Sequence, residues 1–239
     1  MIHSILFFGN IHEEKYGPED IFGTLHDKIR ERFPEPFSQY TTCVPQKTPF
    51  SYFLELVVKF CDHAEDRVKE KLSETLRECG KSGDLYPLIA VVICICEIGD
   101  SRYYGASLSC GSDKVREIMT TVSCLHVWHP KVSSAVMSVF PDDTAKEAHG
   151  IILPDSVKCK AYAVVKISKL KRPCKRCSDL FSLPNNTDVL NYPGNCAETE
   201  AISNFLHAEP GLKVEETFKL EMVRRVKDKY EYDVSVVYV

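Results

Sequence analysis

The sequence has no apolar run that approaches the roughly 18 residues a membrane-spanning helix needs. The one apolar burst near its start, residues 5–8, is short and has neither a basic leader nor a small-residue cleavage site. Internal repeats and low-complexity segments are also missing. We therefore expect a globular protein of the cytoplasm or nucleus, with no signal peptide and no association with membranes.

The sequence also lacks a large excess of charge of one sign. Its net charge is −4, with 27% charged and 44% hydrophobic residues, which are ordinary values for a globular protein. This balance argues against a protein built to coat nucleic acid. A chain of 239 residues can form one large or two small domains whose core needs no disulfides.

Cysteine, in contrast, is abundant, with eleven residues. Without a signal peptide we expect reduced thiols, some of them buried and some binding metal. Cys94 and Cys96 lie in an apolar run and are interpreted as core residues of a strand, with a redox pair less favoured. Cys124, His126 and His129 lie close together in the sequence, and core packing is a better interpretation of them than a second metal site.

The order of the expected elements predicts an α/β fold with a mostly helical N-terminal region. Residues 1–85 form that region, of unknown role, and residues 86–239 form a layered α/β domain. The expected helices are 18–33, 51–79, 113–123, 177–183 and 196–207, with a further short helix opening at 141–144. The expected strands are 88–98, 102–109, 162–167, 215–226 and 230–239, and the first two form a hairpin.

Two short runs near the C-terminus carry the chemistry: Pro173-Cys174-Lys175-Arg176-Cys177 and Asn195-Cys196-Ala197-Glu198. Three thiolates are the protein share of a zinc site that keeps one coordination position open, and a nearby carboxylate can move protons for a water there. Both runs fall at predicted helix starts, the second capped by Asn195, where free N–H groups offset the negative charge of the thiolates.

Two plainer interpretations of these cysteines remain. In the first, the zinc is structural and Cys159 or His207 supplies a fourth ligand. In the second, there is no metal, and the cysteines are buried thiols beside a solvated glutamate.

The two runs resemble the signatures of the zinc-dependent cytidine and nucleobase deaminase superfamily, a Cys-Ala-Glu and a Pro-Cys-x-x-Cys, each at a helix start. Here their chain order is reversed. The resemblance covers residues 86–239 and implies a deaminase-like sheet flanked by helices, with Zn²⁺ held by Cys174, Cys177 and Cys196 and with Glu198 as the proton shuttle. It implies hydrolytic deamination of a cytosine- or adenine-type base. The alternative is an inactive, zinc-stabilised protein of the same fold that binds or regulates.

The resemblance also bears on the substrate. A nucleobase-containing molecule is the implied partner, as a nucleoside, a nucleotide or a nucleic acid, although the net charge does not favour the last. Nucleoside enzymes of the family often carry a sugar-binding Asn after the second strand, where this chain has Gly105-Ala106-Ser107. Six basic residues flank the site and either attract an anionic substrate, form a solvated face or serve as a nuclear address: Lys166, Lys169, Lys171, Arg172, Lys175 and Arg176. Three tyrosines are candidates for stacking on a base: Tyr103, Tyr104 and Tyr192.

Overall fold

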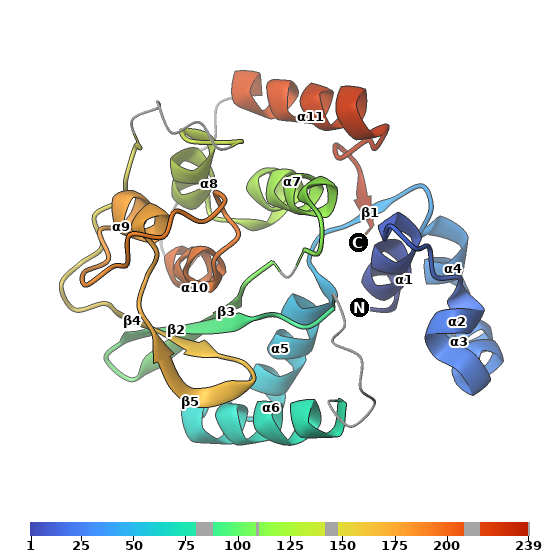
Figure 1. The fold of residues 1–239 in the computed structure, drawn as a ribbon, viewed down its shortest axis with the longest axis horizontal. Coiled ribbons are helices and arrows are strands. Elements are labelled where there is room, and N and C mark those ends of the chain that lie inside the picture. Colours follow the sequence, from blue (N-terminus) through green and yellow to red (C-terminus); the bar gives the residue numbers. More distant parts are fainter. Residues whose placement is uncertain (80–87, 109, 142–147, 208–215, 239) are drawn as a thin grey trace.

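A four-stranded antiparallel sheet separates two layers of helices (Figure 1). The computed structural model describes residues 1–79, 88–108, 110–141, 148–207 and 216–238. The strand order is β3-β2-β4-β5, formed by Ser101–Ala106, Val92–Ile98, Lys158–Ala163 and Lys166–Lys171. The predicted α/β class and the hairpin of β2 and β3 are therefore confirmed.

Strand β2 is buried on both faces because its side chains alternate between two cores. Ile93 and Ile95 pack on one side against α5 (Pro49–Phe60) and α6 (Glu65–Cys79). Cys94 and Cys96 face the other side, where the core includes residues of α7 (Asp113–Val122), α8 (Pro130–Met137) and α10 (Ala197–Leu206). These four side chains of β2 are 0% exposed, so the core role predicted for both cysteines is confirmed.

Helix α10 lies unusually close to the hairpin of β2 and β3. A Cβ atom added to Gly105 would lie 2.2 Å from the backbone nitrogen of Ala201, so only glycine permits this approach. The carboxylate of Glu200 accepts a hydrogen bond of 2.6 Å from the N–H of Ala106, and it accepts another from the hydroxyl of Ser51 at 3.1 Å. These contacts fix the position of α10 and of the cysteine at its start.

The N-terminal region is mostly helical, as predicted, and it shares its core with the rest of the chain. Phe7 and Phe8 pack in the same core as α7 and α10. The first helices are α1 (Ile2–Ile11), α2 (Pro18–Phe22), α3 (His26–Arg32) and α4 (Pro34–Gln39). The short strands β1 (Val44–Pro45) and β6 (Val237–Tyr238) then pair in parallel, next to the N-terminal helices. The boundary between residues 85 and 86 stays a prediction.

Two predicted helices are interrupted. The helix expected at 18–33 breaks at Gly23, whose φ of 48° is unsuited to a continuing helix. The helix expected at 51–79 is two helices, because Asp62 and His63 between α5 and α6 also have positive φ angles. The change from an apolar first half to a charged second half in this segment marks the break.

Three of the predicted strands also need correction. The single strand expected at 162–167 is instead the end of β4 and the start of β5, which are separated by a turn at residues 164–165. The strand expected at 215–226 is wrong, because Glu216–Tyr230 forms helix α11, which buries Met222 and Val226 at helical spacing. The last expected strand shrinks to β6. Most of the short helix expected at 141–144 lies outside the described residues.

Among the described residues, no helix combines the length and apolar character needed to cross a membrane.

Candidate metal centre

The structure brings the three predicted cysteines together. Their sulfur atoms all lie within 4.8 Å of one another, and those of Cys174 and Cys196 are 3.6 Å apart. Zinc–sulfur bonds of about 2.3 Å in a tetrahedral site place two sulfurs about 3.8 Å apart. The donor set and its spacing therefore fit one zinc ion held by Cys174, Cys177 and Cys196.

Each of the two cysteine runs opens a helix, as the sequence predicts. Cys174 is the N-cap of α9 (Lys175–Phe181), and its sulfur accepts a hydrogen bond of 3.4 Å from the N–H of Cys177. The N-cap of α10 is Cys196 itself, so the predicted cap at Asn195 is wrong by one residue. The sulfur of Cys196 makes no capping bond, which leaves it directed at the other two sulfurs. The positive ends of two helices thus lie beside the cluster.

The three thiols hydrogen-bond one another, and this sets their protonation. Hydrogen bonds donated by Cys177 and Cys196 hold the pKa of Cys174 far below its ordinary value. The bond to Cys174 correspondingly raises the pKa of Cys177 and of Cys196. One negative charge is thus stabilised by three sulfurs, and a bound cation supplies the driving force to remove the other two protons.

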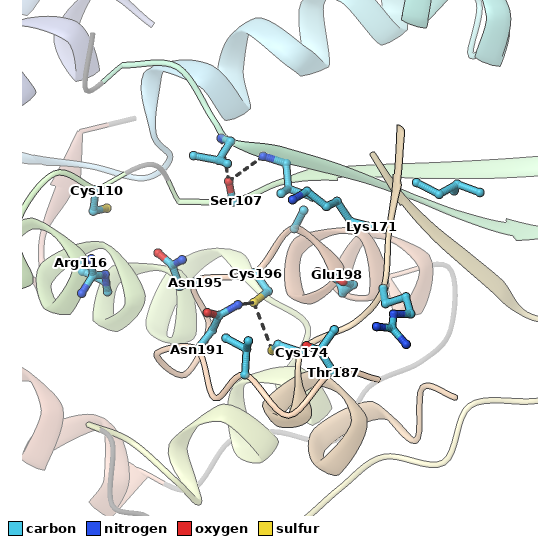
Figure 2. Close-up of a pocket in the computed structure, with 16 residues that line it drawn as sticks. Ser107, Cys110, Arg116, Lys171, Cys174, Thr187, Asn191, Asn195, Cys196 and Glu198 are labelled. Atoms are coloured by element: carbon cyan, nitrogen blue, oxygen red, sulfur yellow. Dashed lines mark hydrogen bonds between the residues drawn. The ribbon is translucent and has the colours of Figure 1, made fainter. Parts of the chain in front are cut away.

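Glu198 lies next to this cluster at the first turn of α10. Its side chain is buried, with the residue only 5% exposed, and it lines the same cleft as Cys174 and Cys196 (Figure 2). Burial raises the pKa of its carboxyl group to about 7. Near neutral pH such a group exists in both protonation states, as a residue that accepts and returns a proton must.

A cleft of about 640 Å³ is lined by Cys174, Cys196 and Glu198. This volume is within the range of small-molecule sites, about 300–1,000 Å³. Its walls combine apolar, uncharged polar and cationic side chains. The apolar ones are Val91, Val92, Leu170 and Val189, the uncharged polar ones are Ser107, Thr187, Asn191 and Asn195, and the cationic ones are Arg116, Lys171 and Arg172. The cleft can therefore hold a small molecule that carries both apolar and polar groups.

Asn191 contributes to the centre, although nothing in the sequence singles it out. Its side-chain amide donates a hydrogen bond of 3.3 Å to the sulfur of Cys196 (Figure 2). Its backbone makes a hydrogen bond that lowers the pKa of Cys174. The Nε atom of Arg176, a residue only 5% exposed, donates to the carbonyl oxygen of Asn191 at 3.4 Å. Asn191 thus contacts two of the three sulfurs and is itself held in place.

We expect Asn191→Ala to weaken zinc binding roughly 10- to 100-fold, the usual cost of removing a group that orients a metal ligand. The measurement is competition for zinc against a chromophoric chelator. Asn186→Ala is the matched control, because Asn186 lies on the same loop and its side-chain amide donates to the backbone oxygen of the neighbouring Thr187. Equal zinc affinity in the Asn191 variant and the wild type would remove Asn191 from the centre.

Neither residue considered as a fourth ligand joins the cluster. Cys159 lies opposite Cys96 in the sheet, and His207 follows α10 at the end away from Cys196. The Nε2 atom of His207 is 2.9 Å from the carbonyl oxygen of Val127. Among the described residues, no further histidine, cysteine or carboxylate belongs to this group of sulfurs.

The expectation that the cysteines are reduced is wrong for one pair, because Cys96 and Cys159 form a disulfide. They face each other in register on β2 and β4, with Cα atoms 4.2 Å apart, which sequence spacing does not reveal. Cys94 lies on the same face of β2, and the three form a second close cysteine group.

The candidates around Trp128 and the three candidate tyrosines lie outside the cleft. His126 and His129 make hydrogen bonds with backbone groups, at the carbonyl oxygen of Val234 and the N–H of Lys131, and the described residues show no metal cluster with Cys124. The three candidate tyrosines do not line the cleft either. Tyr104 donates to the carbonyl oxygen of His63, Tyr103 packs edge-on against Phe205, and Tyr192 packs against Phe140.

Comparison of the chain with protein-family models, with curated proteins and with solved structures found no match. The interpretation of the site therefore rests on its own geometry.

Proposed function

We propose that the protein is a zinc-dependent hydrolytic deaminase that acts on a cytosine- or adenine-type base. One observation carries the proposal: three sulfurs spaced for a single zinc lie beside a buried carboxylate, and this carboxylate and two of the three cysteines line a cleft of small-molecule size. A site with three protein ligands and a neighbouring proton carrier is the arrangement of catalytic zinc, whereas structural zinc usually has four protein ligands.

Each part of the cleft has a role in this proposal. Cys174, Cys177 and Cys196 would hold the zinc, which when bound supplies Lewis acidity and makes water a nucleophile near neutral pH. Asn191 keeps two of the sulfurs in place. The apolar walls hold the base and exclude bulk water, which strengthens electrostatic interactions at the reacting carbon.

Glu198 carries the protons. It accepts one proton from the attacking water as the new C–O bond forms at the amidine carbon of the base, and it delivers that proton to the ring nitrogen. A second proton from the water follows to the exocyclic nitrogen, the C–N bond breaks, and ammonia leaves. The base gains a carbonyl oxygen, and Glu198 returns to its starting state.

The test is a screen for ammonia release over free bases, nucleosides, nucleotides and single strands. We expect release with at least one substrate class, loss of release after the zinc is chelated, and recovery when zinc is restored. Zinc-loaded protein that is inert across the whole screen would contradict the proposal and favour an inactive binding protein of this fold.

A further inference from the structure

The six basic residues that flank the cysteines divide into three groups in the structure. Lys171 and Arg172, at the end of β5, line the cleft. Lys175 pairs with Asp179 on the surface of α9, and buried Arg176 holds Asn191. The remaining two, Lys166 and Lys169, lie on the same strand but do not line the cleft.

Arg116 also lines the cleft, but its ion pairing differs from that of Lys171 and Arg172. Arg116 forms an ion pair of 2.6 Å with Asp113, and its guanidinium lies 5.5 Å from the centre of the Tyr192 ring. Neither Lys171 nor Arg172 forms an ion pair with another residue in the described part of the chain. Their charges therefore remain available to a ligand in the cleft.

The cleft is thus electrically asymmetric. With zinc bound, the cysteine end of the cleft would carry negative charge, because zinc with three thiolates has a net charge of −1 and Glu198 lines the same cleft. Lys171, labelled in Figure 2, and Arg172 line the same cleft at the end of β5, and neither is paired with an acidic side chain among the described residues. An anion would be repelled from the cysteine end and attracted to these cations, while a neutral base carries no such penalty at the cysteine end.

We infer that Lys171 and Arg172 form a phosphate subsite, and that the substrate is a nucleoside monophosphate or a closely related phosphorylated nucleoside. This inference rests on the proposed function. Arginine and lysine are the side chains that bind phosphate most strongly, with arginine able to donate two parallel hydrogen bonds.

A mononucleotide fits the cleft better than a nucleic acid strand does. The chain carries a net charge of −4, which opposes binding of a polyanion. Proteins that hold single strands use aromatic side chains as stacking surfaces, and none of the described residues that line this cleft is aromatic. Substitution of Lys166 and Lys169, which lie on β5 outside the cleft, tests the alternative that a nucleic acid strand binds here.

The experiment compares binding of cytidine with cytidine 5′-monophosphate, and of adenosine with adenosine 5′-monophosphate, by titration calorimetry. It uses zinc-loaded Glu198→Gln protein, so that no ligand is consumed. We expect the monophosphate of the preferred base to bind roughly 10- to 100-fold more tightly than its nucleoside, the effect of even one charge-assisted hydrogen bond. When Lys171→Ala and Arg172→Ala are added to the Glu198→Gln protein, the tighter binding of the monophosphate should be lost. The affinity for the nucleoside should stay unchanged.

The matched control adds Lys166→Ala and Lys169→Ala, which remove two charges from the same strand. It should keep the full preference for the monophosphate. The inference would be overturned if the Glu198→Gln protein, with Lys171 and Arg172 intact, bound nucleoside and monophosphate with equal affinity. So would an oligonucleotide that binds more tightly than the monophosphate and depends on Lys166 and Lys169. Because binding is measured without turnover, failure of the phosphate subsite is distinguishable from failure of the deaminase proposal.

Discussion

Glu198→Gln should keep the zinc and the fold but reduce deamination by at least ~10²–10⁴-fold, the usual value of general acid–base catalysis. The amide is nearly isosteric with the carboxyl group, and Glu198 does not belong to the cluster of sulfurs. The amide that replaces the carboxyl group cannot, however, accept a proton from water. Since one group would serve several transfers, the loss should reach or exceed the upper part of that range. Ammonia release and zinc content are measured on the same preparations.

Glu200→Gln provides the control on the same helix. Glu200 is also buried, but it bonds the backbone of β3 and a serine of α5 and does not line the cleft. We expect this variant to lose stability while its activity per folded molecule stays within a few-fold of the wild type. Loss of zinc in Glu198→Gln would identify Glu198 as a ligand, and equal activity in Glu198→Gln and wild type would show that another group carries the proton.

Cys177→Ser should abolish stoichiometric zinc binding and the stability that zinc confers. A ligand bound only by the folded state stabilises it by about 4 kcal/mol when its free concentration is a thousand times its dissociation constant. We therefore expect chelation to lower the free energy of unfolding of the wild type by about that amount. Chelation should have no effect on the variant. Denaturant unfolding with and without chelator measures both.

Cys124→Ser separates the loss of a ligand from the loss of a buried thiol. Cys124 is 3% exposed and lies outside both cysteine groups. Burying a hydroxyl there should cost roughly 1–3 kcal/mol. Zinc content and the response to chelation should nevertheless match the wild type. Stoichiometric zinc in Cys177→Ser, or chelation that leaves the wild type equally stable, would exclude the centre described above.

The sequence predicts the close cysteine group because its spacing carries geometric information, and zinc at that group stays a prediction. A Cys-x-x-Cys at a helix start places two sulfurs within one turn, and a second helix start supplies the third. The helical N-terminal region, the strand β2 and the helices near the cysteines also follow from their apolar periodicity. The convergence of Cys174 and Cys196 is the one step that needs the fold, and the close approach permitted by Gly105 provides it.

Other features depend on contacts that the sequence does not record. The β-branched run around Val164 and Val165 resembles a strand but forms the turn between β4 and β5. The segment of α11 alternates enough apolar residues to suggest a strand, whereas its burial follows helical spacing, at Met222 and Val226. Asn191 lies in an irregular loop, where no periodicity points to it, and only the path of the chain brings it to Cys196.

The zinc-edge X-ray absorption spectrum of the zinc-loaded protein tests the central claim most directly, because it reports the number and kind of atoms around the metal. We expect three sulfur atoms at about 2.3 Å and one oxygen or nitrogen atom at about 2.0 Å. The spectrum of the Cys196→Ser protein should lose one sulfur or lose the metal altogether. Four sulfur atoms around the zinc, or a purified protein that binds no zinc, would contradict an open, catalytic metal centre.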